Sequence, residues 1–304
     1  MRFVEFLSGK GPSLGVVRDG QIYEVNRLSR SLPARMIDLI RGGTAVEDAL
    51  RKVLQDPPPN AIIGKFSEIL LRAPLPNAPK LLCVAGNYTE HILESGFPAP
   101  ERGRLITPQF FFKFPSTCII GPDDPVPMCS RTVAMDWELE LAAVIGTGGR
   151  EIRASSALDH VFGYTIINDI SERKLNSDLQ GRHMRPNDTF FDWLNGKLFD
   201  SSAPLGPAVI TDDEIPDPQN LTLRLEVNGE VMQHSSTSKM IFTVAELIVW
   251  ISQYVTLEPG DIIATGTPAG TGMSSGRFLV AGDVMCGSIE HLGCLRNRVV
   301  RASV

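Results

Sequence analysis

Four acidic residues on two apolar segments are the residues of this sequence best suited to chemistry. Asp136, Glu138 and Glu140 alternate within the run 135–145, which is otherwise apolar enough for a buried or half-buried β-strand. Side chains two residues apart on a strand project from the same face, so these three carboxylates are expected to crowd one surface. Asp169 ends a second apolar run, 161–169, which predicts a strand with one carboxylate at its tip.

Carboxylates held together on a partly desolvated face repel one another unless some are protonated or a cation lies among them. An isolated Glu-x-Glu pair more often faces water from an edge strand, but the additional acid at Asp169 favours a bound divalent metal. Oxygen ligands without a His or Cys cluster suit hard cations better than zinc or copper. These acidic residues therefore predict a divalent-metal site, with Mg²⁺ favoured and Mn²⁺ or Ca²⁺ as alternatives.

His91 and Glu94 form a second candidate group, on a short helix expected after the strand 81–85. At positions i and i+3 the two side chains share one helix face. A carboxylate beside an imidazole fixes its tautomer and raises its basicity, which makes a general base near neutral pH. Such a pair is by itself more often an exposed helix pair, and the acidic residues elsewhere strengthen the catalytic interpretation.

The composition excludes several other classes of protein. A net charge of −6 over 304 residues gives no general attraction to nucleic acid or to anionic membranes. We expect no transmembrane helix, no signal peptide and a cytoplasmic location. The five cysteines have no Cys-x-x-Cys spacing and are expected to be reduced and mostly buried.

Turn and helix signals divide the chain into a small N-terminal domain, 1–75, and a main domain, 80–304. Asp19-Gly20 predicts a hairpin, and two short helices are expected near 33–40 and 46–54. The Pro-rich stretch 73–79 is the expected linker.

In the main domain, the alternating run 221–230 with its Asn-Gly turn predicts a second hairpin. A capping box at Thr243 and Glu246 predicts a core-facing helix. The Gly-rich loop 266–272 lacks the endings of nucleotide-binding loops, so it is either an anion-approaching loop or a plain tight connection.

Several ordered motifs make the sequence similar to the fumarylacetoacetate hydrolase family, from Leu81 to about Val300. The motifs are Gly86-Asn-Tyr-Thr-Glu-His91, Phe112-Lys-Phe-Pro-Ser116, Asp136-Trp-Glu-Leu-Glu140, Asn168-Asp-Ile-Ser-Glu-Arg173, Gly196-Lys197 before Phe199-Asp200, Val227-Asn-Gly-Glu230 and 260–270. The resemblance implies an α+β, mostly β fold, with a rolled mixed β-sheet main domain, a small N-terminal α/β domain and a homodimeric assembly. It also implies that Glu138, Glu140 and Asp169 bind the metal and that His91 and Glu94 lie on a lid.

The same resemblance implies a metal-dependent hydrolase that cleaves a carbon–carbon bond in a 1,3-diketo acid, such as an acylpyruvate or fumarylpyruvate, through a metal-bound enolate. His91 and Glu94 would activate water, and Lys197 would stabilise the developing charge. Lys113 and Arg173 would hold anionic groups of the keto acid, with Asn176 and Thr267 as further contacts. Alternatives are an oxaloacetate decarboxylase, a keto–enol isomerase or hydratase, and a non-enzymatic protein with a structural cation site.

Two features depart from the family pattern. Lys174 and Asn176 stand where the family often has Asp and Gln, so a substrate contact is expected to differ there. The long segment 177–193 is expected to be a surface loop, with a reshaped pocket or a dimer contact as the alternatives.

Overall fold

The computed structural model describes residues 1–9, 11–100, 105–128 and 131–302, and most of its regular elements are strands. The N-terminal unit contains β1 (Arg2–Ser8), β2 (Gly11–Arg18), β3 (Gln21–Glu24), β4 (Ile62–Lys65), β5 (Leu71–Arg72), α1 (Val25–Leu28) and α2 (Met36–Val53). Asp19 and Gly20 both have positive φ in the turn between β2 and β3, which confirms the predicted hairpin. Helix α2 joins the two predicted helices across a kink at Gly43.

We call the rest of the chain the C-terminal region. Its strands are β6 (Leu81–Ala85), β7 (Gln109–Lys113), β8 (Ile119–Ile120), β9 (Val126–Met128), β10 (Met135–Asp136), β11 (Leu139–Ile145), β12 (Val161–Asn168), β13 (Ser171–Glu172), β14 (Ala203–Thr211), β15 (Thr222–Val227), β16 (Glu230–Ser236), β17 (Ile262–Ala264), β18 (Val284–Ile289) and β19 (Gly293–Arg301). Its helices are α3 (Thr89–Glu94), α4 (Pro115–Cys118), α5 (Asp188–Asn195), α6 (Val244–Tyr254) and α7 (Gly272–Ser275).

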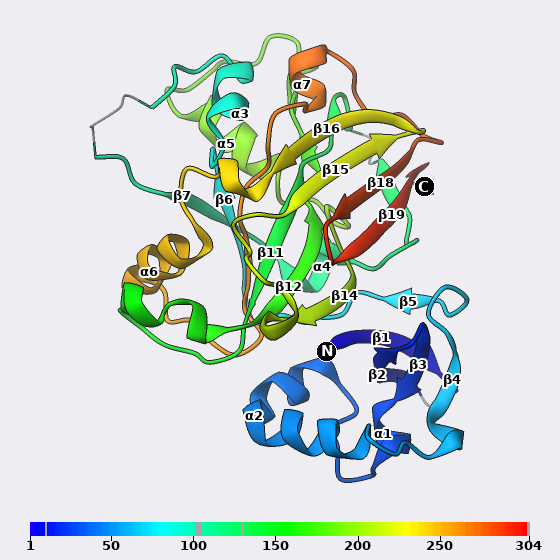
Figure 1. Ribbon diagram of the computed structural model, residues 1–304. Coiled ribbons are helices and arrows are strands. Elements are labelled where there is room, and N and C mark those ends of the chain that lie inside the picture. Colours follow the sequence, from blue (N-terminus) through cyan, green and yellow to red (C-terminus); the bar gives the residue numbers. More distant parts are fainter. Residues whose placement is uncertain (10, 101–104, 129–130, 303–304) are drawn as a thin grey trace.

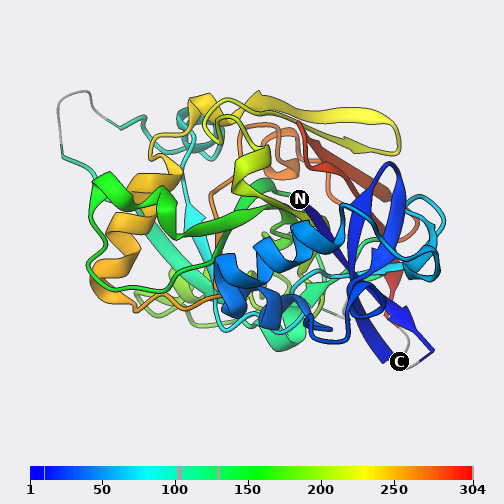
Figure 2. The same cartoon turned by 60° about the horizontal axis from the view of Figure 1, so that its bottom comes forward.

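The longest sheet joins the two parts of the chain. Its order is β4-β3-β2-β1-β14-β12-β11-β17-β6-β7, with β5 beside β1 and β8 beside β14 (Figure 1). The junction is the antiparallel pairing of β1 with β14, where Phe3 faces Val209. Figure 2 shows the N-terminal unit, in blue, in front of the C-terminal region. The domain limits 1–75 and 80–304 stay a prediction, since one sheet spans both parts.

The central strands β11, β12 and β14 are buried along their whole length, as expected for strands covered on both faces. Alternate side chains of β11 enter different hydrophobic clusters: Leu141 and Ala143 pack in one, Ala142 and Val144 in the other. Glu140 continues the face of Ala142 and Val144. Glu140 is therefore buried next to an apolar layer, where a carboxylate charge is costly without a hydrogen bond or a cation.

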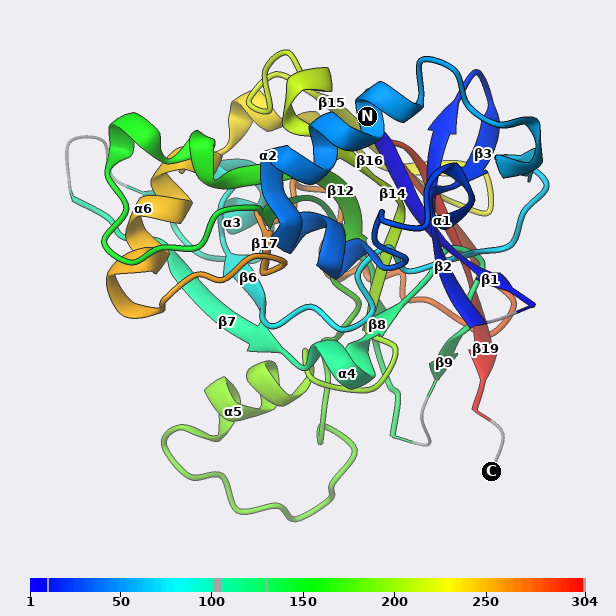
Figure 3. The ribbon, with the colours of Figure 1, turned by 90° about the horizontal axis from the view of Figure 1, so that it is seen from below.

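A second sheet, of order β16-β15-β18-β19-β9, packs beside the first (Figure 1). Asn228 and Gly229, both with positive φ, turn β15 into β16 as predicted. Helix α6 begins with the predicted capping box, because Thr243 accepts from the Glu246 amide and the Glu246 carboxylate accepts from the Thr243 amide. Figure 3 shows α5 and the loop before it extending away from the sheets.

The cysteine prediction is wrong for one pair. Cys286 on β18 and Cys294 on β19 form a disulfide, with Cα atoms 6.4 Å apart. Cys83 and Cys118 are free and buried, as predicted, and Cys129 lies outside the described residues. The pairing depends on the register of two adjacent strands, which residue spacing does not reveal. Within the described ranges, no helix is long and apolar enough to cross a membrane.

Candidate metal and catalytic site

The pairing of β11 with β12 brings the acidic residues of two motifs together. Leu139 lies opposite Asn168, and the Asp169 amide donates to the Glu138 carbonyl at 2.8 Å. The Asn168 side chain accepts from the Glu138 amide at 2.9 Å and so fixes the entry into β11. Residues 31 positions apart therefore meet at one end of a buried strand pair.

We call Glu138, Glu140 and Asp169 the carboxylate triad. One oxygen from each lies within 4.8 Å of the others, and all three side chains are buried. The structure brings together the three predicted metal ligands.

Asp136 does not belong to the triad, and the prediction of one continuous strand is wrong here. The run is interrupted at Trp137 and Glu138, between β10 and β11. Asp136 instead accepts from the backbone amides of Gly272 at 2.6 Å and Met273 at 3.1 Å. It anchors the loop of α7 against the strand.

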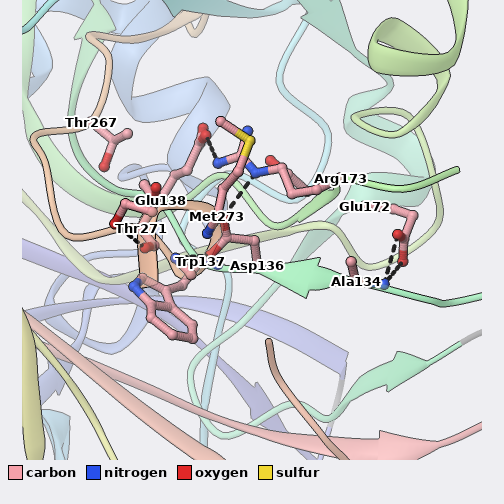
Figure 4. Close-up of polar contacts among 12 residues, drawn as sticks. Ala134, Asp136, Trp137, Glu138, Glu172, Arg173, Thr267, Thr271 and Met273 are labelled. Atoms are coloured by element: carbon pink, nitrogen blue, oxygen red, sulfur yellow. Dashed lines mark hydrogen bonds and ion pairs between the residues drawn. The ribbon is translucent and has the colours of Figure 1, made fainter. Parts of the chain in front are cut away.

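Two cationic side chains contact the triad from the segment after β12. Lys197 Nζ lies 2.6 Å from Glu138 Oε2 and 2.8 Å from Asp169 Oδ2. Arg173 bonds the other Glu138 oxygen and, at 2.8 Å, Asp136 Oδ2 (Figure 4). Both side chains are nearly fully buried, so neither is the exposed cation that most lysines and arginines become.

Lys113 lies behind Asp169. Its Nζ is 2.8 Å from Asp169 Oδ1 and also donates to the Ile170 carbonyl and to the carbonyl and hydroxyl of Ser202. An ammonium has three hydrogens, and protein oxygens already surround this one. The geometry therefore fits a positioning role for Lys113, and the predicted substrate contact stays untested.

The charges of the site do not balance. With Asp136, four carboxylates face Lys113, Lys197 and Arg173. Burial, followed by the charges of Asp169 and Glu138, raises the pKa of Glu140 well above its usual value. Burial also opposes ionisation of Glu138, but Arg173 and Lys197 outweigh it and lower the pKa of Glu138. Glu140 is thus the carboxylate that most needs another cation.

A hard divalent cation fits this donor set. Asp169 Oδ1 is buried and forms an ion pair with Lys113 Nζ at 2.8 Å, but that ammonium also donates to three neutral oxygens. Three carboxylate oxygens are ligands typical of Mg²⁺, Mn²⁺ or Ca²⁺. The clustered carboxylate oxygens and the raised pKa of Glu140 both agree with a metal held by the triad.

The predicted His91–Glu94 pair forms on α3. His91 Nδ1 lies 2.8 Å from Glu94 Oε1, which leaves Nε2 as the ring nitrogen available to a substrate. Glu94 also accepts from the Gly270 amide at 2.8 Å and from the Thr271 hydroxyl at 2.9 Å. Burial opposes ionisation of Glu94, but these hydrogen bonds prevail and lower its pKa. The imidazole is close enough to Glu138 to help lower the pKa of that carboxyl.

The Gly-rich loop does approach anions, and they are the protein's own carboxylates. The Gly266 amide donates to Glu140 at 2.7 Å, the Gly270 amide to Glu94 and the Gly272 amide to Asp136. Gly270 has a φ of 102°, and a Cβ there would lie 2.0 Å from the Met232 carbonyl oxygen. Only glycine fits such a backbone. We call His91 and Glu94 the dyad. The loop therefore holds one member of the triad and one member of the dyad.

The remaining predicted contacts, Thr267 and Asn176, bond other parts of the protein. The Thr267 hydroxyl donates to the Leu139 carbonyl at 3.0 Å and accepts from Gln233 at 2.8 Å. Asn176, in the loop that precedes α5, donates to Asp192 on that helix at 2.8 Å. Both side chains hold protein segments, and substrate contacts by either one stay predictions.

Sequence reasoning missed two supporting residues that lie inside the quoted motifs. Glu172 is buried and accepts from the amides of Val133 and Ala134, which holds the chain entering β10 (Figure 4). Asn87 donates to the Thr265 carbonyl at 2.7 Å and so ties the start of α3 to the Gly-rich loop. Both are polar residues within largely apolar motifs, and this pattern could have indicated their supporting role.

Comparisons with known proteins agree with this arrangement. The sequence model of the family described as "Fumarylacetoacetate (FAA) hydrolase C-terminal" matches residues 80–300. A curated relative, the Xenopus laevis "Oxaloacetate tautomerase fahd2, mitochondrial", is 40% identical over 99% of this chain and 90% of its own length.

Two solved structures share the fold over nearly the whole chain. The fumarylacetoacetate hydrolase from Exiguobacterium antarcticum has a TM-score of 0.78 at 32% identity and covers 99% of this chain and 100% of its own. The maleylpyruvate hydrolase from Sphingobium sp. SYK-6, in complex with manganese (II) ion and pyruvate, has a TM-score of 0.77 at 28% identity and covers 100% of both chains. The predicted family and its mostly β fold are confirmed: this chain belongs to the fumarylacetoacetate hydrolase family.

Proposed function

We propose that this chain is a divalent-metal-dependent enzyme that interconverts the keto and enol forms of a small 2-oxo dicarboxylic acid, with oxaloacetate as the first substrate to test. The observation that carries the proposal is a buried carboxylate triad next to a His–Glu dyad. Relatives named oxaloacetate tautomerases, similar over 99% of the chain, favour this reaction within the family. It was one of the alternatives left open by the sequence.

A cation at the triad would bind the substrate's carboxylate and 2-oxo oxygen and polarise that carbonyl. Lys197 and Arg173 surround the same carboxylates with fixed positive charge in a site from which water is largely excluded. Charges placed before the reaction stabilise negative charge that develops on the substrate, and this can contribute several kcal/mol to the rate.

His91 is the proposed base. Its Nε2 removes a proton from the carbon next to the 2-oxo group, and the same nitrogen then returns the proton to the neighbouring oxygen. One C–H bond breaks, one O–H bond forms, and His91 ends the cycle as it began. Glu94 holds Nδ1 and stabilises the imidazolium while it carries the proton.

Hydrolytic cleavage of an acylpyruvate is the second candidate. The same His91 nitrogen can remove a proton from water instead of carbon, and the resemblance to the Sphingobium maleylpyruvate hydrolase favours this reading. The two reactions need the same charges and differ in whether water reaches the distal carbonyl.

Parallel assays separate these reactions. Oxaloacetate, acetylpyruvate and maleylpyruvate are incubated with the enzyme and Mg²⁺ or Mn²⁺ while enol absorbance and released pyruvate are followed. A tautomerase accelerates the change in enol absorbance of oxaloacetate without releasing pyruvate. Pyruvate from acetylpyruvate or maleylpyruvate would identify a hydrolase, and pyruvate with CO₂ from oxaloacetate a decarboxylase. No acceleration with any substrate would refute the proposal.

Mg²⁺ as the physiological metal, the cytoplasmic location and the homodimer stay predictions. Exposed aromatic side chains on β7 and α5, among them Phe112, Phe190 and Phe191, would be covered in a dimer. Light scattering during size-exclusion chromatography measures the assembly directly.

A further inference from the structure

Tyr88 is a large buried side chain to which the mechanism above gives no role. It is 1% exposed, yet its ring belongs to neither hydrophobic cluster formed by the described residues. Its hydroxyl is buried and finds no hydrogen-bond partner among them. A buried hydroxyl without a partner destabilises the fold, so its presence calls for an explanation.

The backbone around Tyr88 is fixed against the site. Tyr88 is the N-cap residue of α3, three positions before His91, and it pairs with Met240 in an isolated β-bridge. The preceding Asn87 is tied to the Thr265 carbonyl, and the next amide, of Gly266, holds Glu140. Short links therefore join Tyr88 to the dyad on one side and to the triad on the other.

Burial and the charge of Glu140, a member of the triad, both affect the pKa of the Tyr88 phenol. Burial raises the pKa of Tyr88, and the charge of Glu140 raises it further. A carboxylate acts in this way only on a nearby group. Glu140 Oε2 accepts from the Gly266 amide, and the Tyr88 hydroxyl has no partner among the described residues, so it is free to donate to a ligand.

We propose that the Tyr88 hydroxyl donates a hydrogen bond to an oxygen of the keto acid bound at the carboxylate triad, and is therefore a substrate-binding residue of this site. The inference rests on the proposed function. The ligand supplies the partner that the protein lacks, and the phenol selects oxygen-rich anions over apolar ligands of similar size.

Tyr88→Phe tests this inference, because it removes the oxygen and keeps the ring. Oxalate is a suitable probe, since it presents a pair of chelating oxygens and does not react. Isothermal titration of the Mn²⁺-loaded protein should show oxalate binding at least about tenfold weaker in Tyr88→Phe, the loss expected for one hydrogen bond to a charged acceptor. Mn²⁺ affinity and the thermal midpoint of the metal-free protein should not fall, because the hydroxyl bonds no protein group.

The matched control is Tyr164→Phe. Tyr164 is also buried, but it belongs to a core cluster, and the charges that act on it are Asp212 and Asp217. Oxalate affinity should be unchanged in this control. Equal oxalate binding by wild type and Tyr88→Phe, or a lowered thermal midpoint in Tyr88→Phe, overturns the role of Tyr88 and leaves the proposed function standing. A wild-type protein that binds Mn²⁺ but no oxalate overturns both.

Discussion

Two buried acidic sites in this molecule differ in how completely the protein satisfies them. Glu5 on β1 is 1% exposed and accepts from Arg35 at 3.0 and 3.3 Å and from the Met36 amide at 3.1 Å. One charge meets one charge, and the bonds tie α2 to the N-terminal sheet. The carboxylate triad and Asp136 instead place four carboxylates against three cations, and the pKa of Glu140 is raised well above its usual value. A carboxylate balanced by its own cation is structural, whereas an excess of buried carboxylates favours a bound cation.

Asp169→Asn should give the largest effect. It removes a predicted metal ligand, so we expect the affinity for Mn²⁺ to fall more than about 100-fold, beyond the loss typical of residues that only support a ligand. Turnover should fall with it. The metal-free protein should keep its thermal midpoint, because Lys197 retains Glu138 and Lys113 retains three neutral acceptors. Metal binding by titration and unfolding by calorimetry check the two expectations.

Unchanged metal affinity in Asp169→Asn would remove Asp169 from the ligand set. A large loss of stability in the metal-free Asp169→Asn protein would mean that the triad, like Glu5, is a structural site.

His91→Ala separates the base from the ligands. General-base catalysis contributes about 10²–10⁴-fold, so turnover should fall by that factor while Mn²⁺ affinity changes little. His234→Ala is the matched control, since His234 is exposed on β16. Steady-state kinetics with whichever substrate turns over in the parallel assays measures the effect. Full activity in His91→Ala would show that another group moves the proton.

Glu5→Gln should have the opposite profile to Asp169→Asn. It weakens hydrogen bonds to a buried charge, and we expect the free energy of unfolding to fall by about 1–3 kcal/mol. The value lies at the lower end if Arg35, which is partly exposed, can turn to water. Metal affinity and turnover should match wild type. Denaturant unfolding measures the free energy, titration measures the metal affinity, and steady-state kinetics measures turnover. A loss of metal binding would mean that the two sites are coupled.

Local patterns in the sequence predicted the elements with local causes. Both hairpin turns and the capping box of Thr243 and Glu246 lie where they were expected, because turn and cap residues act within a few positions. The acids also stood out within their buried runs, and the resemblance to the family separated Glu138, Glu140 and Asp169 from Asp136. The acceptors around Lys113 and the disulfide of Cys286 could not be predicted, because they depend on partners brought together by strand register and topology.

Of these substitutions, Glu94→Gln should have the smallest effect. Glu94 combines features of both acidic sites. Its hydrogen bonds from His91, Gly270 and Thr271 satisfy it as fully as Glu5, yet it lies in the dyad. Its pKa is lower in the folded protein, so the carboxylate stabilises the fold above its unfolded pKa of about 4.3. That stabilisation is lost as the pH falls through the folded-state pKa. Glu94→Gln should therefore be less stable than wild type at pH 7 by about 1 kcal/mol.

The difference between wild type and Glu94→Gln should narrow as the pH falls below about 4, because the wild-type carboxyl then takes up a proton and becomes neutral like the amide. Denaturant unfolding of both proteins across this pH range measures the gap. A gap that stays constant or widens in acid would mean that the charge of Glu94 does not stabilise the fold. The dyad would then depend on shape and neutral hydrogen bonds alone, and its carboxylate would resemble neither Glu5 nor the triad.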